Sequence, residues 1–139
     1  MKGTEDMKIL FVCSGNTCRS PMAAALAKQY FESVGRDDLT DSAGLFANPG
    51  EKASEYSVKA MAERNIDISN HRSKQLTPEM VRNADILVPM TDSHANMLNI
   101  LGVDDSKIKQ IGEIHDPFGG SLEIYRECAE ELAKAVQKL

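Results

Sequence analysis

The sequence predicts an α/β protein, a single domain with a doubly wound, four-stranded parallel sheet and helices on both faces. Short apolar runs alternate with longer segments whose apolar residues recur at helical spacing, which is typical of parallel strands connected by helices. The length of 139 residues suits one domain with a substantial core. The predicted strands are 8–12, 40–43, 86–90 and 108–111.

The first strand, 8–12, leads into a helix that we expect over 21–34. Its apolar residues recur every fourth position and form one stripe, which comprises Met22, Leu26, Tyr30 and Val34. Gly35 is placed to end this helix, because glycine readily adopts the left-handed backbone of a helix cap. A loop over 44–50 follows the second strand, 40–43.

The second half of the chain continues the alternation. A helix is expected over 54–64, and Thr77-Pro78 is a favourable start for another, since a capping hydroxyl precedes proline at the first helical position. The third strand is followed by a helix over 91–101, which Gly102 ends. The closing helix, 121–139, carries an apolar stripe made of Leu122, Tyr125, Cys128, Leu132, Ala135 and Leu139.

Residues 1–6 are polar and precede a second methionine, which predicts a flexible N-terminal extension before a domain that spans 7–139. The net charge of −5 disfavours nucleic acid as a partner, since phosphate backbones need a basic face. A small phosphorylated group remains compatible with this charge, because a buried ring of N–H groups with an arginine is locally positive even on an acidic protein.

The cysteine content and the hydropathy pattern favour a protein of the cytoplasm. Three cysteines without paired spacing argue against a disulfide scaffold and fit a reducing compartment. No apolar run is long enough to cross a bilayer, and no apolar leader begins the chain, so neither membrane insertion nor secretion is expected. A monomer is expected, because the sequence has no long exposed apolar pattern.

The run from Cys13 to Ser20 connects the first strand to the first helix. Successive N–H groups of such a turn converge with the helix N-terminus on one point, which forms a site for an anion. The same positive end favours the thiolate form of Cys13, so the loop suggests phosphoryl transfer through a phosphocysteine. The alternative, a small buried residue that ends a core strand, explains the neighbouring residues less well.

Arg19 is the sixth residue after Cys13, and its planar guanidinium can hold two phosphoryl oxygens and the charge that develops on them. A surface arginine at a helix start is less attractive, because a cation there opposes the helix dipole. Ser20 is placed to donate to the Cys13 sulfur, and it can also cap the helix. Gly15 and Asn16 tolerate the left-handed backbone that a tight loop needs.

These residues resemble the low-molecular-weight protein tyrosine phosphatases, and most of all the bacterial protein arginine phosphatases within that family. The matching segments are Val12 to Ala23, Ser42-Ala43-Gly44, His71-Arg72-Ser73, Ala84-Asp85-Ile86-Leu87 and His115-Asp116-Pro117-Phe118. The resemblance covers the chain from Met7 onward. It implies the doubly wound fold and a phosphatase that acts on phosphorylated proteins without cofactor or metal.

The resemblance assigns Cys13 as nucleophile, Arg19 as phosphoryl clamp and Asp116 as the acid that protonates the leaving group and then activates water. Without it, Asp116 would be interpreted as an aspartate that begins a turn before proline. The resemblance also implies a hydrogen-bond network that supports the loop, formed by Asn16, Ser20, Ser42 and His71. The sequence alone marks His71 only as a loop or helix-cap residue.

Substrate contacts are expected from Ser14, Gly15, Asn16, Thr17, Cys18, Ser20 and Phe118. Thr17 bears on specificity, because tyrosine-specific members usually hold a bulky aliphatic residue there and the arginine phosphatases hold threonine. Phe118-Gly119-Gly120 also resembles the arginine-phosphatase branch. Ser14, where threonine is expected, and Pro89-Met90 depart from the family pattern. We therefore favour phosphoarginine as substrate, with phosphotyrosine as the alternative.

The remaining cysteines and histidines have less specific interpretations. Cys18 either forms a reversible disulfide with Cys13 under oxidation or packs beneath the loop. Cys128 lies on the apolar stripe of the last helix and is expected in the core. His115 is expected to be structural or exposed, and His94 is a residue of the first turn of a helix.

Other functional classes lack residues that they need. Neither glycine-rich nucleotide motif is present, and cysteines at this spacing do not form a zinc site. An arsenate reductase relays a disulfide through a downstream pair of cysteines, whereas this chain has only Cys128 there. A cysteine phosphocarrier or an inactive phosphate-binding module would gain nothing from Asp116 and Arg19, so a hydrolase is favoured.

Overall fold

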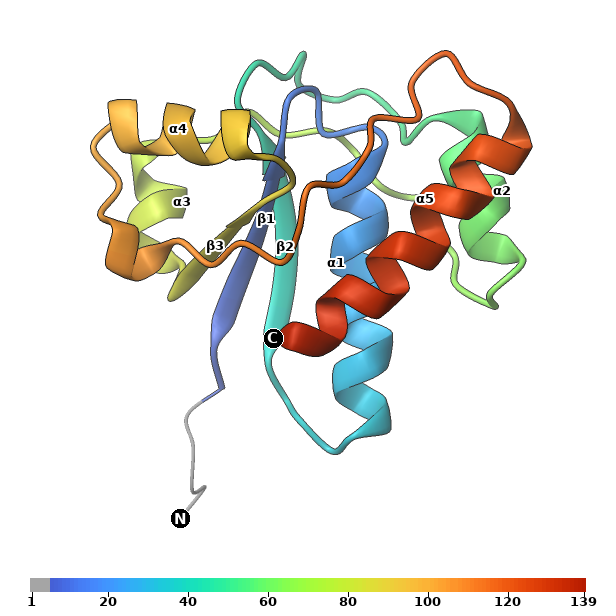
Figure 1. Cartoon of the computed structure of the whole chain (residues 1–139), viewed down its shortest axis with the longest axis horizontal. Coiled ribbons are helices and arrows are strands. Elements are labelled where there is room, and N and C mark those ends of the chain that lie inside the picture. Colours follow the sequence, from blue (N-terminus) through green and yellow to red (C-terminus); the bar gives the residue numbers. More distant parts are fainter. Residues whose placement is uncertain (1–5) are drawn as a thin grey trace.

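The computed structural model describes residues 6–139 and has the predicted α/β architecture (Figure 1). Strand β1 (Lys8–Cys13) is central and pairs in parallel with β2 (Leu39–Gly44) on one side and β3 (Ile86–Pro89) on the other. Because the strands are parallel, their carboxyl ends lie at one edge of the sheet. Most of the predicted N-terminal extension, residues 1–5, lies outside the described residues.

The prediction of a fourth strand over 108–111 is wrong, because in the described part of the chain Ile108 forms only an isolated bridge with Leu87. The Lys109 N–H donates to the Leu87 carbonyl at 2.9 Å. In a strand, every second residue directs its N–H and carbonyl groups to the same neighbouring strand. After Leu87, the next residue of β3 that faces this neighbour is residue 89, and Pro89 has no N–H to donate. The pairing therefore stops after one bridge.

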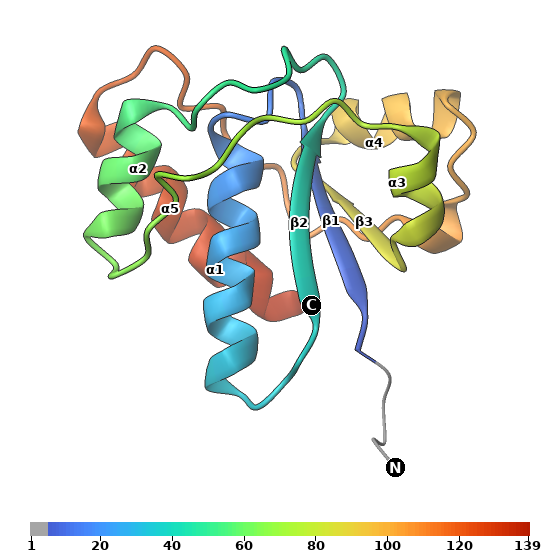
Figure 2. The ribbon, with the colours of Figure 1, turned by 180° about the vertical axis from the view of Figure 1, so that it is seen from behind.

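The helices cover both faces of the sheet (Figures 1 and 2). Helices α1 (Arg19–Ser33) and α5 (Leu122–Ala135) lie on one face with α2 (Glu55–Ala62) packed beside them, and α3 (Pro78–Asn83) and α4 (Asp92–Ile100) lie on the other. Among residues 6–139, none of the helices combines the length and apolar character needed to cross a membrane.

Side-chain caps set the helix starts that the sequence predicts. The Thr77 hydroxyl accepts the N–H of the third helical residue of α3, and Thr91 does the same for α4, each at 3.2 Å. The last predicted helix is shorter than expected, because α5 gives way to a 3₁₀ turn, Val136–Lys138. A second 3₁₀ turn, Asp105–Lys107, precedes the isolated bridge.

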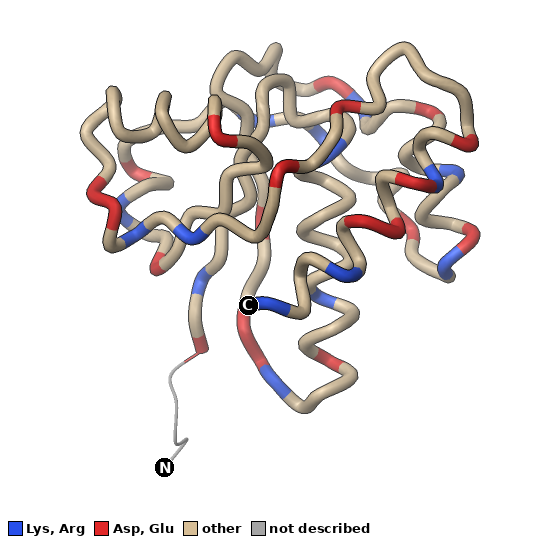
Figure 3. The backbone as a smooth tube through the Cα atoms, viewed as in Figure 1, with Lys and Arg blue, Asp and Glu red and all other residues tan. Residues whose placement is uncertain are grey.

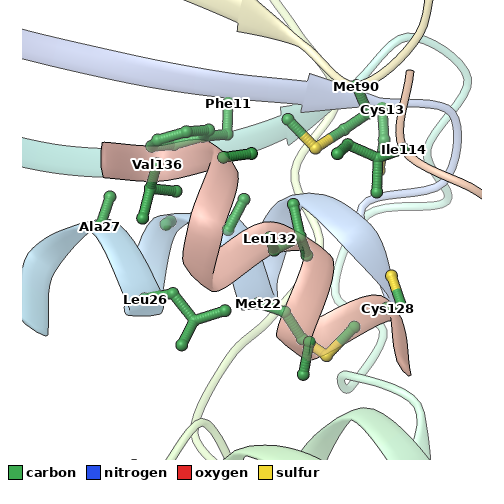
Figure 4. Packing of buried hydrophobic residues seen from close by; sticks show 14 of the residues in the cluster. Phe11, Cys13, Met22, Leu26, Ala27, Met90, Ile114, Cys128, Leu132 and Val136 are labelled. Atoms are coloured by element: carbon green, nitrogen blue, oxygen red, sulfur yellow. The ribbon is translucent and has the colours of Figure 1, made fainter. Parts of the chain in front are cut away.

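The core lies in two clusters, one on each face of β1. Ile9, Phe11 and Cys13 face α1 and α5, whereas Leu10 and Val12 face the side of α3 and α4. This alternation follows from the two-residue period of a strand that is buried on both faces. Figure 4 shows the α1–α5 side, where Met22, Leu26 and Ala27 of α1, Leu132 of α5 and Val136 of the 3₁₀ turn after it pack beneath the strand.

Gly44 ends β2 directly beside the loop that follows β1. A Cβ atom at this position would lie 2.6 Å from the Ser14 carbonyl oxygen and 2.9 Å from the Ala47 Cβ, so only glycine fits without a shift of the backbone. We expect Gly44→Ala to lower the free energy of unfolding by about 1–3 kcal/mol, the usual cost of overpacking. Urea denaturation measures this loss, and an unchanged midpoint would contradict the tight approach.

Cys128 lies in the core on α5, as the sequence predicts. Burial, with a smaller contribution from Glu131, raises the pKa of the Cys128 thiol to about 12. Only about one Cys128 in 10⁴ is therefore thiolate at pH 8, and the fraction rises about tenfold for each pH unit towards 12. We expect iodoacetamide to leave Cys128 unmodified in the folded protein at pH 8 and to modify it after unfolding in urea. Peptide mass spectrometry distinguishes the two states, and modification of the folded protein would refute the prediction.

Candidate active site

A cleft of about 300 Å³ opens at the carboxyl ends of the strands, where Cys13 ends β1 and Arg19 begins α1. All residues predicted to be catalytic or to contact substrate line it, with the exception of Ser20. Glu51, which the sequence did not single out, lines it as well. The lining residues are Cys13, Ser14, Gly15, Asn16, Thr17, Cys18, Arg19, Glu51, Asp116 and Phe118.

Several carbonyl groups of Cys13 and the loop over 14–18 accept hydrogen bonds from the segments around the loop. The contacts are Cys13 with Leu45 N–H (2.9 Å), Ser14 with Phe46 N–H (2.9 Å), Asn16 with His71 Nε2 (2.7 Å) and Thr17 with Ser54 N–H (2.9 Å). A peptide N–H points opposite to its carbonyl, so the N–H groups of the loop turn to the other side. Within residues 6–139 the N–H groups of 14–18 have no partner in the protein. They form a cradle for an anion.

Asn16 holds this loop from inside. Its backbone is left-handed, with φ at 61°, and its side chain is fully buried. The side-chain amide donates to Ser20 Oγ (2.8 Å) and Ser42 Oγ (2.9 Å) and accepts the Lys74 N–H (2.9 Å). Gly15, by contrast, does not adopt the left-handed backbone that its residue type allowed. The contacts of Asn16 therefore connect the residues that the family resemblance groups together.

Ser20 lies beneath the nucleophile position instead of lining the cleft. Its Oγ is 2.8 Å from Cys13 Sγ, and both side chains are buried. Ser20 Oγ also accepts an N–H from Asn16 and keeps its own proton to donate, whereas a thiolate can only accept. A thiolate at Cys13 would thus receive a hydrogen bond from a fixed donor.

Arg19 is buried and fixed by the segment after the isolated bridge. Its Nη1 donates to the Ile114 carbonyl at 3.1 Å, and its Nη2 lies 3.5 Å from Asp116 Oδ2. The Nε of Arg19 is buried and lacks a hydrogen-bond partner among the described residues. Asp116 itself is half exposed, and its Oδ1 accepts the N–H of Phe118, a residue of the cleft that is 78% exposed. A buried cation therefore lies below an exposed carboxylate.

Cys18 packs beneath the loop in its reduced form. Its thiol donates to Ser54 Oγ at 3.4 Å and lies 3.4 Å from the Tyr125 hydroxyl. Burial and the bond to Cys18 raise the pKa of Tyr125 to about 12, so this phenol is neutral at physiological pH. The sequence analysis placed Tyr125 only on an apolar stripe, because nothing in its spacing points to the loop.

His94 is a further residue that the sequence analysis did not connect to the loop. It lies in the first turn of α4, as predicted, but it is 6% exposed and its Nε2 is 2.9 Å from Ser14 Oγ. Burial first, and the Arg19 guanidinium second, lower the pKa of His94 below its ordinary value. His115, in contrast, is exposed.

The wider surface mixes charges of both signs. Figure 3 shows Asp and Glu interspersed with Lys and Arg along the backbone. Within residues 6–139, no three side chains of His, Cys, Asp or Glu come together as a metal site would require. The positive groups of the cleft are therefore Arg19 and the backbone N–H groups.

Comparisons with known proteins agree with this geometry. The family model described as low molecular weight phosphotyrosine protein phosphatase matches residues 8–139. A protein-arginine-phosphatase of Bacillus subtilis is 38% identical over 142 residues, covering 96% of this chain and 94% of the relative. The low molecular weight protein-tyrosine-phosphatase PtpB of Staphylococcus haemolyticus is 39% identical over 140 residues, which cover 96% of this chain and 97% of the relative.

A solved structure of the arginine phosphatase YwlE, a cysteine-to-serine mutant with a phosphorylated active-site serine, is also similar. It superposes with a TM-score of 0.90 at 38% identity and covers 95% of this chain and 92% of that chain. The family model and both relatives extend over almost the whole chain, so the similarity includes the cleft and the core together. The chain therefore belongs to the low molecular weight phosphotyrosine protein phosphatase family.

Proposed function

We propose that this protein hydrolyses phosphoarginine in proteins through a phosphocysteine intermediate. The observation that carries the proposal is the charge arrangement of the cleft. A cradle of N–H groups and the buried Arg19 lie at its base, whereas the carboxylates of Glu51 and Asp116 line its more exposed part. A phosphorylated guanidinium has a matching order of charges, with an anionic phosphoryl group followed by a cation.

The first step is attack of the Cys13 thiolate on phosphorus. The Ser20 hydroxyl, 2.8 Å from the sulfur, stabilises the thiolate before the attack and again when the thiolate leaves. The N–H groups of the loop and the Arg19 guanidinium hold the oxygens on which negative charge develops in the transition state. The unpartnered Nε–H of Arg19 would find an acceptor in such an oxygen, which removes a cost of about 1–3 kcal/mol for a buried unpaired donor.

Asp116 is the residue that exchanges protons with the leaving group and with water. Its carboxylate lies at the mouth of the cleft, 3.5 Å from Arg19 and half exposed, where the leaving group departs. In its protonated form it gives a proton to the arginine nitrogen as the P–N bond breaks and the S–P bond forms. The carboxylate that results then accepts a proton from the water that attacks phosphocysteine and releases the Cys13 thiolate. The ion pair with Arg19 and the bond from the Phe118 N–H keep the carboxylate directed to the cleft.

Two features favour phosphoarginine. Thr17 lines the cleft with a hydroxyl where an aliphatic side chain would present an apolar surface to an aromatic ring. Glu51 is held in place by Ser73, which is buried and bonds to both its N–H and its carbonyl. These bonds hold the backbone of Glu51, whereas the residue as a whole is exposed. A carboxylate beside the phosphoryl site repels a simple anion and attracts a guanidinium. The arginine phosphatases among the relatives support the same choice.

Phosphotyrosine is the second candidate, and the exposed ring of Phe118 favours it. An aromatic side chain at the entrance can stack on the ring of a phosphotyrosine. The PtpB relatives, named as tyrosine phosphatases, support this reading. An arsenate reductase or a phosphocarrier is less well supported, because Cys128 is buried in the core away from the cleft lining and because Asp116 and Arg19 suit hydrolysis.

The substrates are therefore phosphorylated proteins, and the chemistry suits a reducing compartment such as the cytoplasm. Cys13 must remain a thiol or thiolate to act as nucleophile, and Cys18 in the same loop could otherwise oxidise with it. A cysteine nucleophile and an arginine clamp supply the chemistry without a cofactor.

The proposed substrate predicts a preference for phosphoarginine over phosphotyrosine that a substitution at Thr17 should reverse. We expect wild-type kcat/KM to be higher for a phosphoarginine peptide than for the matched phosphotyrosine peptide, and Thr17→Ile to invert the order by removing the polar wall. Release of inorganic phosphate from the purified, reduced protein measures both constants. Cys13→Ser is the matched control and must show no turnover, because serine lacks the thiolate nucleophile.

If phosphotyrosine is preferred and Thr17→Ile changes little, the protein is a tyrosine phosphatase and the charge argument is wrong. Residual turnover in Cys13→Ser would exclude the phosphocysteine mechanism itself.

The acid role of Asp116 predicts a dependence on the leaving group. Asp116→Asn removes the proton donor, so kcat on a poor leaving group such as phosphotyrosine should fall by about 10²-fold or more. The activated ester p-nitrophenyl phosphate needs little protonation and should lose much less. Glu113→Gln is the matched control, because Glu113 lies on the same segment but does not line the cleft. Equal losses on the two esters would contradict the role.

A further inference from the structure

His94 connects α4 to the catalytic loop, which lies 80 residues away in the sequence. Its Nε2 is 2.9 Å from Ser14 Oγ, and its Nδ1 is 3.0 Å from Thr91 Oγ1. Both ring nitrogens are therefore engaged, and the side chain is almost completely buried. A buried imidazole with two hydrogen-bond partners has one orientation, so it forms a rigid connection between the helix and the loop.

The charged groups around the imidazole come from two other segments. Arg19 of α1 opposes a positive charge on the ring, and burial opposes it more strongly, whereas Asp116 and Glu113 favour it to a smaller extent. The ring is therefore neutral at pH 7. A neutral imidazole can bond to both hydroxyls in either tautomer, because each hydroxyl can donate or accept.

Ser14, to which His94 is bonded, is the residue that follows the nucleophile Cys13. Its carbonyl accepts the Phe46 N–H at 2.9 Å, and within the described residues His94 is the partner of its side chain. The carbonyl bond holds the peptide group after Ser14, and the bond between the Cys13 carbonyl and the Leu45 N–H holds the peptide group before it. The His94 bond fixes the side chain that projects from the Cα between these two peptide groups. The N–H groups of Ser14 and Gly15 belong to those peptides and to the anion cradle.

We propose that His94 is a positioning residue of this active site, which acts through Ser14 to hold the first N–H groups of the loop toward the phosphoryl oxygens. The inference rests on the proposed phosphatase activity, but it does not depend on which phosphorylated side chain is the substrate. The Asn16 network supports the middle of the loop, and His94 supports its beginning beside Cys13.

A displaced N–H donor weakens the transition state more than the bound substrate, because the charge on the phosphoryl oxygens is redistributed as the bonds change. We therefore expect His94→Leu to lower kcat about tenfold and to change KM by less than about threefold. Ser14→Ala removes the other end of the bond and should have the same effect. If His94 acts only through Ser14, the double variant loses no more than either single variant.

The experiment measures kcat and KM of the full chain on a phosphoarginine peptide and on p-nitrophenyl phosphate for these three variants and for His94→Gln. The glutamine amide can donate or accept at the position of Nε2, so it should restore kcat to within about threefold of wild type. His115→Leu is the control for the loss of a nearby histidine, since His115 is exposed and its side chain has no contact with the loop.

Thermal unfolding of each variant separates positioning from folding. If His94→Leu does not fold, His94→Gln and Ser14→Ala still decide the matter, with near wild-type kcat expected for the first and about a tenfold loss for the second. Wild-type kcat in His94→Leu, or losses that multiply in the double variant, would overturn the proposal. A folded His94→Gln that stays as slow as His94→Leu would overturn it as well.

Affinity for inorganic phosphate, measured by calorimetry, keeps this test independent of turnover. We expect the dissociation constant to rise several-fold in His94→Leu and to stay unchanged in His115→Leu, because the cradle alone binds the free anion. A wild-type chain that binds phosphate but turns over neither phosphorylated substrate would refute the proposed function. The phosphate affinities of the variants would then decide the role of His94 by themselves, and equal affinities would overturn it.

Discussion

The active site depends on the loop over 14–18, whose N–H groups have no acceptor among the described residues. Such an arrangement is unfavourable by itself, because the N–H dipoles repel one another and no protein acceptor compensates them. The loop exists because its carbonyls and side chains are bonded to the surrounding protein. Asn16 contributes most, since its buried amide bonds in three directions and its left-handed backbone reverses the chain. The cradle is therefore formed before any substrate arrives.

The sheet supplies the fixed frame for these bonds. β1 is central and buried on both faces, so its last residue, Cys13, is held by packing from the two helix layers. The end of β2 lies so close to the loop that only Gly44 fits there, and the residues that follow it donate to the carbonyls of Cys13 and Ser14. The end of the parallel sheet is thus the site at which one loop can be bonded from several elements.

The positive and negative groups of the cleft lie at different depths. Arg19 and the N–H groups are buried, where electrostatic interactions are strong, whereas Asp116 and Glu51 lie closer to solvent, which screens them. The carboxylates can therefore recognise a leaving group or move a proton without preventing phosphoryl binding. His94 remains neutral beside Arg19 and so adds a hydrogen bond to the loop without adding charge.

The sequence by itself determined the α/β class, three of the strands and the residues of the catalytic loop, because these are properties of local spacing. It also determined the helix starts except that of α1, which begins at Arg19 without the side-chain cap that Ser20 was expected to supply. Hydrophobic period, capping hydroxyls and the run from Cys13 to Ser20 act over short stretches of chain. Only the tertiary structure decided that Pro89 ends the pairing of segment 108–111 with β3. The missing N–H of proline has an effect only where a neighbouring segment offers a carbonyl to it. It also decided that His94, Tyr125 and Glu51 lie at the loop, because contacts between residues far apart in the sequence leave no periodic pattern in it.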